Sequence, residues 1–154
     1  MKREILFRAK CLKRKIWVQG GYTSYMYDHF RKELRTKEHI IMTKDYGDII
    51  HVEPNTLGEF TNLYDKNGKY LWERDIARYT FNHHGIKVTF EGVICHSCSF
   101  DSLSGYSSSW GLATSPNKLK IFNYDFKPSD CELLGNLVDN PELIKNSEQF
   151  GILF

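Results

Sequence analysis

The sequence predicts a mainly β protein, a small bent β-barrel of the SH3-like kind with an inserted arm and a short C-terminal helix. Three observations predict this fold. Aromatic residues make up 14% of the chain, and Tyr, Phe and Trp favour strands. Short apolar runs alternate with turn signals, of which the clearest is Asn67-Gly68. One helix start stands near the end, where Asn140 precedes Pro141 at the first helical position.

Length and composition fit one domain. The chain has 154 residues, 41% of them hydrophobic, which is enough for a packed core. We therefore predict a single domain over residues 1–154, in which residues 19–44 form an insertion or arm. No apolar run approaches the ~20 residues that cross a bilayer, and no signal peptide is evident, so we expect a cytoplasmic protein without membrane contact. Four cysteines in such a protein are expected to be reduced.

The strands are predicted in order from alternating apolar positions and the turns between them. Residues 3–11 and 16–18 form the first hairpin, with a basic turn at residues 13–15. Residues 40–42 and 49–53 follow. Residues 57–79 hold two apolar runs around the turn at 65–68. Residues 86–90, 93–95, 110–113, 119–126 and 132–138 complete the set, and the Ser- and Gly-rich residues 101–109 are predicted as a loop.

Charge is divided unevenly along the chain. Residues 1–44 hold 12 Lys and Arg against 4 Asp and Glu, a balance of +8, whereas residues 45–154 hold 9 against 15, a balance of −6. Basic residues beside aromatic ones are typical of proteins that bind single-stranded nucleic acid. The candidate nucleic-acid-binding residues are Arg3, Arg8, Lys10, Lys13, Arg14, Lys15 and Trp17. The alternative is that this basic face docks on an acidic surface of a protein partner or a second copy.

A metal site is a second candidate. Cys95 and Cys98 are separated by two residues, and His83 and His84 lie upstream, which together supply the thiolate and imidazole ligands of a tetrahedral zinc site. The alternative is a plain hairpin in which one thiol packs inward. Because a second Cys pair is absent from the sequence, we predict no metal and no other cofactor.

A third candidate is an acidic cluster around one histidine. His51 and Glu53 fall on the same side of a predicted strand, just after Asp45 and Asp48 in the preceding turn. Such a group can bind a divalent ion or act as a base in hydrolysis. The alternative, which we favour, is an exposed polar strand face. Nucleotide-binding and serine-nucleophile motifs are absent from the sequence, so we expect no enzyme and no small-molecule ligand.

Three separated stretches of the sequence are distinctive: Arg-Glu-Ile-x-Phe-Arg-Ala near the start, the stretch around Asp-Lys-Asn-Gly in the middle, and Gly-Asn-x-x-Asp-Asn-Pro-Glu-Leu near the end. Together they resemble the YopX family of bacteriophage and prophage proteins. The resemblance implies structural roles for nine residues: Asp65, Asn67, Gly68, Glu73, Asp75, Gly135, Asn136, Asn140 and Pro141. One departure is Arg74, which stands where the family has glycine. If that glycine has a positive φ, Arg74 must adopt a strained backbone or a changed turn.

The family resemblance implies no settled activity. We predict a non-enzymatic β-domain that acts through protein contacts or self-assembly, with a homo-oligomer or a protein partner expected. A nucleic-acid-binding module that uses the basic N-terminal hairpin is the alternative. A metal-dependent hydrolase is a weaker one.

Overall fold

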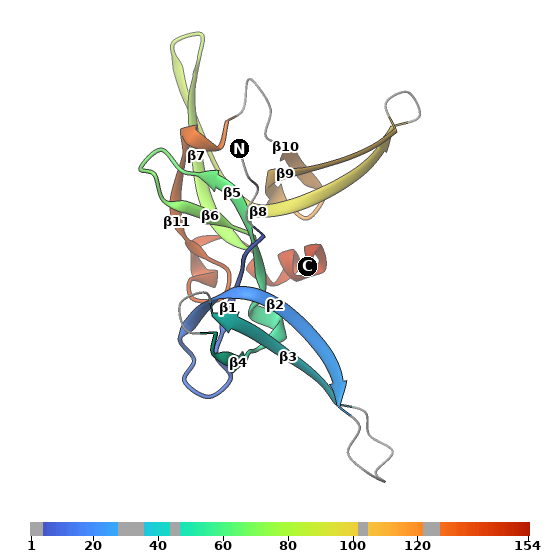
Figure 1. The fold of residues 1–154 in the computed structure, drawn as a ribbon. Helices are drawn as coiled ribbons and strands as arrows, with labels where there is room; N and C mark the ends of the chain where they lie inside the picture. Colours follow the sequence, from blue (N-terminus) through green and yellow to red (C-terminus); the bar gives the residue numbers. More distant parts are fainter. Residues whose placement is uncertain (1–4, 28–35, 44–46, 102–104, 122–126) are drawn as a thin grey trace. The chain divides into compact units, whose positions relative to one another are not determined.

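The computed structural model describes residues 5–27, 36–43, 47–101, 105–121 and 127–154, and for residues 25–27, 36, 97–101, 105–108, 121 and 151–153 it describes the backbone alone. The described part is mainly β, as predicted, with eleven strands and short 3-10 turns (Figure 1). Within it the strands form two antiparallel sheets. No helix of the described part is long and apolar enough to span a membrane.

The chain divides into two compact units, unit 1 at residues 1–60 and unit 2 at residues 61–154. Strand β5 (Gly58–Tyr64) begins in the first and ends in the second. The single domain predicted for residues 1–154 therefore stays a prediction, and each unit is described by itself.

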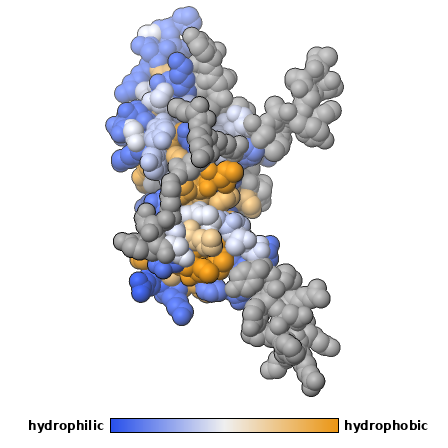
Figure 2. Space-filling model, in the orientation of Figure 1, coloured by the Kyte–Doolittle hydropathy of each residue, from blue (hydrophilic) through white to orange (hydrophobic). Residues whose placement is uncertain are grey.

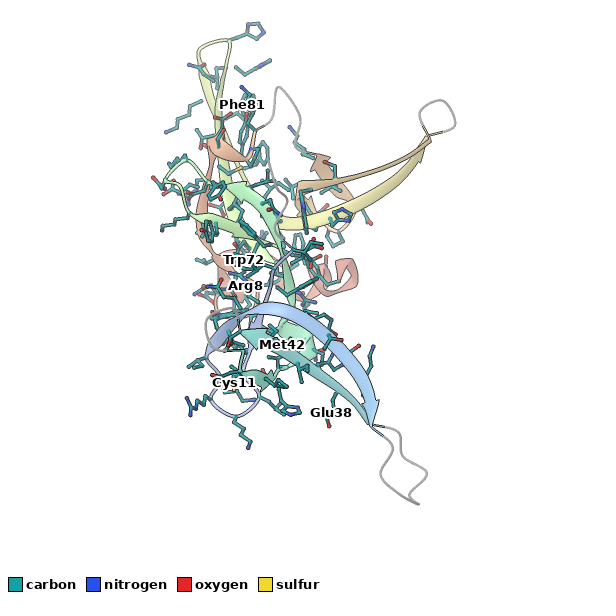
Figure 3. All side chains as sticks on the ribbon, viewed as in Figure 1. Arg8, Cys11, Glu38, Met42, Trp72 and Phe81 are labelled. Carbon is teal, nitrogen blue, oxygen red and sulfur yellow. The ribbon has the colours of Figure 1, made fainter. Side chains whose placement is uncertain are left out.

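Unit 1 is a curled sheet. Its strands are β1 (Phe7–Lys10), β2 (Trp17–Tyr27), β3 (Thr36–Thr43) and β4 (Ile49–His51), in the order β4-β3-β2-β1, and the start of β5 pairs with β1. The 3-10 turn η1 (Pro54–Thr56) links β4 to β5. The described residues of the predicted arm at 19–44 lie in β2 and β3, which pair from Gly20 to Tyr27 as a long antiparallel ribbon, and its residues 28–35 and 44 lie outside the described part. Figure 3 shows Met42 and Glu38 on β3, with Glu38 toward the far end of this ribbon.

The core of unit 1 lies inside this curl. Ala9, Ile41 and Val52 are fully or almost fully buried, and Val18 and Ile50 pack against them. One glycine is required for the ribbon to pass close to its neighbour. A Cβ on Gly20 would lie 1.9 Å from the carbonyl oxygen of Met42, a distance that side-chain atoms do not tolerate.

The curl brings the last strand back to the first at one point. Cys11, just after β1, forms a bridge with Val52, just after β4. On either side of it, the Leu12 N–H donates to the His51 carbonyl at 2.9 Å and the Glu53 N–H donates to the Lys10 carbonyl at 2.9 Å. The pairing ends there, so the sheet stays open. The prediction of a closed barrel was therefore wrong for the described residues.

Unit 2 is built on a second, five-stranded sheet. Its order is β10-β9-β8-β7-β11, formed by β7 (Asp75–His83), β8 (Ile86–Asp101), β9 (Gly105–Ser115), β10 (Lys118–Ile121) and β11 (Cys131–Asn136). The end of β5 pairs with the short strand β6 (Tyr70–Trp72). Two apolar clusters form its core, one around Ile94 and Leu112 and one around Ile76 and Phe150.

Two local predictions in unit 2 need correction. The Ser-rich stretch predicted as a loop is largely paired strand, since residues 97–101 of β8 pair with residues 105–109 of β9. The C-terminal helix is not an α-helix in the described residues but a set of 3-10 turns, η2 (Pro128–Asp130), η3 (Pro141–Leu143) and η4 (Ser147–Leu153). Pro141 does start η3, but the side chain of Asn140 makes no cap bond to it.

Candidate functional site

The basic residues predicted to bind nucleic acid separate into two groups. Arg8 and Lys10 on β1 lie over the ring of Trp17 on β2, at 4.8 Å and 5.7 Å from its centre. Both cations therefore form cation–π contacts within their own protein, and each contact contributes about 0.5–1 kcal/mol. Lys13 and Arg14 are exposed in the turn between β1 and β2. Arg3 lies outside the described residues.

The third basic residue of the turn, Lys15, has a partner within the chain. Its ammonium group forms an ion pair with the carboxylate of Glu53. The backbone of Lys15 has a φ of 58°, and its N–H donates to the Cys11 carbonyl at 2.9 Å, while the Cys11 N–H donates to the Ile16 carbonyl at 2.8 Å. The turn at residues 11–16 is thus a hydrogen-bonded loop that holds Lys13 and Arg14 out to solvent.

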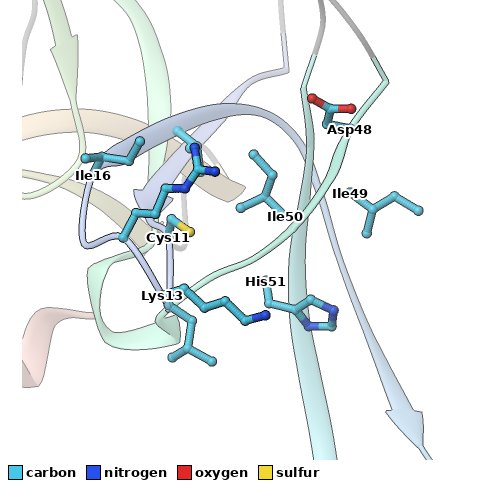
Figure 4. Close-up of a pocket in the computed structure, with 10 residues that line it drawn as sticks. Cys11, Lys13, Ile16, Asp48, Ile49, Ile50 and His51 are labelled. Atoms are coloured by element: carbon cyan, nitrogen blue, oxygen red, sulfur yellow. The ribbon is translucent and has the colours of Figure 1, made fainter.

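A pocket of about 450 Å³ lies between this turn and β4 (Figure 4). This volume falls in the range of about 300–1,000 Å³ that binding pockets usually have. Figure 4 shows Cys11, Lys13 and Ile16 of the turn on one side, and Asp48 with β4 on the other. The lining residues are Cys11, Leu12, Lys13, Arg14, Ile16, Val18, Asp48, Ile49, Ile50 and His51.

The pocket has an apolar interior and an apolar margin. Val18 and Ile50 are half-buried and pack against the core of unit 1, so the inner end of the pocket is continuous with that core. At the margin, Leu12, Ile16 and Ile49 are 49%, 53% and 62% exposed. Figure 2 shows apolar surface on the part of the molecule that unit 1 forms, between hydrophilic areas. Large aliphatic side chains gathered on one exposed site are typical of interaction surfaces.

Met42 extends this apolar margin. It is 50% exposed and pairs with Ile49 across β3 and β4. Leu12, Ile16, Ile49 and Met42 are hereafter called the apolar rim.

The thiol of Cys11 lies in the pocket at intermediate exposure. The backbone N–H groups of Arg14 and Lys13 point at its sulfur and lower the pKa of Cys11 below the ordinary value, and the charges of the same two side chains act in the same direction. A larger fraction of thiolate makes a cysteine more reactive. Cys11 therefore reports on access to the pocket.

The described residues of the candidate acidic cluster around His51 have separate partners, in keeping with the polar strand face that we favoured. Nδ1 of His51 lies 3.1 Å from Oε2 of Glu38, which is on the neighbouring strand β3, and Glu53 pairs with Lys15. Asp48 is exposed at the pocket mouth, and Asp45 lies outside the described residues. The two strand residues thus have different charged partners.

The predicted zinc ligands are also kept apart. His83 and His84 lie at the turn of the β7–β8 hairpin, and Cys95 lies nine residues beyond the start of β8 at Ile86. At ~3.3 Å per residue this separates them by about 30 Å. Burial raises the pKa of Cys95 to about 11. Only the backbone of Cys98 is described.

The turn at 65–69 is organised by one buried carboxylate. Asp65 is 3% exposed, and its Oδ1 accepts the N–H groups of Asn67 and Lys69, each at 2.8 Å. Its Oδ2 accepts the N–H of Leu133 on β11 at 3.0 Å. Gly68 has a φ of 75°, which is the left-handed conformation that a turn at Asn67-Gly68 favours. Asp65 therefore ties the turn to the five-stranded sheet.

The next motif is the turn between β6 and β7. Oδ2 of the buried Asp75 accepts the N–H of Trp72 at 2.9 Å. Arg74 has a φ of 70°, so an arginine occupies the left-handed position expected for the family's glycine. Its guanidinium lies 4.5 Å from the ring centre of Phe154. Glu73 is half-buried, and its negative charge adds to burial in raising the pKa of Cys95.

The last motif closes unit 2. Oδ1 of Asn136 accepts the N–H groups of Val138 and Asp139 at 3.0 Å and 2.9 Å. The side chain of Asn140 accepts the N–H of Asn136 at 3.4 Å, and a Cβ on Gly135 would lie 2.5 Å from its oxygen. These contacts join residues close in sequence and fix the backbone of the 135–140 turn in unit 2. The pocket lies in unit 1.

The sequence reasoning missed the apolar part of the pocket. It singled out the charges of the first turn but not Leu12 and Ile16, which flank them. A usable signal was present in the sequence. Leu12 and Ile16 directly flank a turn whose basic side chains must reach solvent, so these two aliphatic side chains lie close to the surface.

Comparison with known proteins supports the family resemblance. The family model described as YopX protein matches residues 6–145. No curated protein matches the chain in sequence. A solved structure, protein EF1440 from Enterococcus faecalis, is similar over 94% of this chain and 100% of its own, with 17% sequence identity and a TM-score of 0.41. Since the family model covers nearly the whole chain, the protein belongs to the YopX family.

Proposed function

We propose that this protein is a non-enzymatic interaction domain, whose unit 1 binds a segment of a partner protein in the pocket between the 11–16 turn and β4. The observation that carries the proposal is the coincidence of the apolar rim with that pocket. Three of its members line the pocket and the fourth pairs with one of them. Each aliphatic side chain that a partner buries contributes about 1.5–3 kcal/mol.

The charge of the pocket favours a protein segment that carries carboxylates. Lys13 and Arg14 are exposed at the mouth against one carboxylate there, Asp48, and residues 1–60 hold 12 Lys and Arg against 8 Asp and Glu. A complementary acidic partner would be attracted to such a surface. The setting that we propose is the cytoplasm, as expected from the sequence, of a cell that carries a phage or prophage, as the family resemblance implies.

Nucleic-acid binding remains the second candidate, because Lys13 and Arg14 are exposed beside each other. Two observations weigh against it. Arg8 and Lys10 lie on Trp17, and Lys15 is paired with Glu53, so fewer cations are available to phosphates than the sequence offers. A hydrolase is supported less, because His51 and Glu53 have separate partners.

The test is selection of a random twelve-residue peptide library on the immobilised protein. Two variants make it specific: Ile49→Asp places a charge on the rim, and Ile86→Asp places the same charge at a residue of similar exposure, 68% against 62%, in the β7–β8 hairpin. Enrichment on the wild type and on Ile86→Asp, lost on Ile49→Asp, supports the proposal. Absence of enrichment, or equal enrichment on Ile49→Asp, overturns it.

Two further measurements separate the alternatives. Anisotropy of labelled single- and double-stranded DNA at low salt, with Lys13→Glu as the variant, tests nucleic-acid binding. Light scattering of the wild type and Ile49→Asp shows whether the segment comes from a second copy. Tight, salt-sensitive DNA binding that depends on Lys13, without peptide enrichment, would make nucleic acid the function.

A further inference from the structure

We infer that the segment bound in this pocket is an extended one, which adds a strand to the outer edge of β4 and places a carboxylate beside Lys13 and Arg14. The inference rests on the proposed function and specifies the partner's chemistry. It is argued from the hydrogen-bonding pattern of β4, from the course of the chain after Cys11, and from the charges at the pocket mouth.

Strand β4 is the edge of its sheet. It pairs with β3 on one side, where the Val52 N–H donates to the His39 carbonyl at 2.9 Å and the Thr43 N–H donates to the Asp48 carbonyl at 3.0 Å. Backbone groups alternate in direction along an antiparallel strand. Ile50 therefore directs its backbone groups toward β3, and Ile49 directs its N–H and C=O outward.

The protein itself uses this outer edge two residues beyond Ile49. The carbonyl of His51 accepts the N–H of Leu12 at 2.9 Å, in line with the Cys11–Val52 bridge. After Leu12 the chain turns away through residues 13–16. The place beside Ile49 and Ile50 that a continued strand would fill is where the pocket lies. An added strand would thus continue a pairing that the chain begins and then leaves.

The side chains around this edge specify what the added strand carries. Successive side chains of a strand point to opposite faces, so every second side chain of the segment would face the pocket. Val18 and Ile50 at the inner end favour an aliphatic or aromatic side chain there. Lys13 and Arg14 at the mouth favour Asp or Glu in a neighbouring position of the segment. Strand addition of this kind takes affinity from the main chain and specificity from pockets.

The test uses the most enriched peptide from the library and two sets of derivatives. In the first set, each backbone nitrogen is methylated in turn, which removes one N–H at a time. In the second set, each carboxylate is replaced by its amide. Binding is measured by anisotropy on the wild type, on Lys13→Glu and Arg14→Glu, and on Lys87→Glu, a matched charge reversal of an exposed lysine on β8.

We expect N-methylation to weaken binding at least tenfold at alternate positions of the peptide core and less than twofold between them. One amide replacement, and each of the two pocket variants, should weaken binding by about fivefold, the effect of an exposed ion pair of about 1 kcal/mol. Lys87→Glu should change nothing. Rim-dependent binding with no alternation, or without a carboxylate requirement, overturns the inference and leaves the proposed function standing. If no peptide is enriched, both fail.

Discussion

Replacement of Asp65 by Asn should destabilise unit 2 because it leaves one buried N–H facing another donor. In the structure Oδ1 of Asp65 accepts the N–H groups of Asn67 and Lys69, and Oδ2 accepts that of Leu133. An asparagine can keep the first two bonds through its oxygen. Its NH2 group would then stand opposite the Leu133 N–H, which can no longer be satisfied.

The magnitude follows from these bonds. An unsatisfied buried donor costs about 1–3 kcal/mol, so we expect Asp65→Asn to lower the free energy of unfolding by about 2 kcal/mol. In Asp65→Ala all three bonds are lost. Because Asn67 and Lys69 are exposed and water can reach them, the two further bonds add about 0.5–1.5 kcal/mol each. We therefore expect about 3–5 kcal/mol for the alanine.

The same network sets a pH dependence. Burial raises the pKa of Asp65, but the N–H groups of Leu133, Lys69 and Asn67 together lower it further, so the net pKa lies below the ordinary value. A carboxyl with a depressed folded pKa stabilises the protein above its unfolded pKa of about 3.9, and that stabilisation is lost as the pH falls through the folded pKa. The difference between the wild type and Asp65→Asn should therefore shrink below about pH 4.

Urea unfolding followed by Trp fluorescence measures these differences at pH 7 and at intervals down to pH 2.5. Asp130→Asn is the matched control, since Asp130 is exposed, and it should stay within about 0.5 kcal/mol of the wild type. The reasoning is refuted if Asp65→Asn is as stable as Asp130→Asn at pH 7. It is also refuted if the deficit of Asp65→Asn is unchanged in acid.

Three further outcomes are expected. Gly20→Ala should lower the free energy of unfolding by about 3 kcal/mol or more in urea, because its Cβ would overlap the Met42 carbonyl. Gly21→Ala, with open space around it, should be nearly neutral, and equal effects of the two variants would contradict the structure. Arg74→Gly should be more stable than Arg74→Ala by about 1 kcal/mol, because both variants lose the guanidinium but only glycine adopts a φ of 70° without steric strain. The reverse order of stability would contradict the left-handed turn. In a Cys98→Ser background, iodoacetamide should alkylate Cys11 before the buried thiols, and the pH midpoint of the alkylation rate should lie below the pKa of a free cysteine. A pH midpoint at or above that pKa would contradict the contacts at this thiol.

The sequence predicted the strands and turns better than their assembly. The turn at Asp65–Gly68 follows from local chemistry, because Asn, Asp and Gly tolerate the positive φ that such a turn requires. The left-handed backbone of Arg74 was expected only on the condition that the glycine at this place in the family has a positive φ. The extent of β8 and β9 did not follow, since a Ser-rich stretch reads as a loop until a neighbouring strand is there to pair with it. Closure into a barrel failed for a similar reason, because it depends on how far the pairing at Cys11 and Val52 extends.

The candidate site shows the same division. Lys13 and Arg14 could be picked out because charge is read directly from the sequence. Proximity in the sequence was a poor guide to the zinc and hydrolase candidates, since His51 and Glu53, two residues apart, have partners on different segments. The apolar rim was missed because exposure of an aliphatic side chain depends on what the rest of the chain leaves uncovered.

The central claim, that the pocket of unit 1 binds a partner segment, is tested most directly by amide chemical-shift mapping. The 15N-labelled protein is titrated with the most enriched library peptide. We expect the shifted signals to belong to the 11–18 segment and to residues 48–51, and we expect Ile49→Asp to abolish the shifts while Ile86→Asp leaves them unchanged. Shifts centred on the β7–β8 hairpin or elsewhere in unit 2, or shifts that persist in Ile49→Asp, would contradict it.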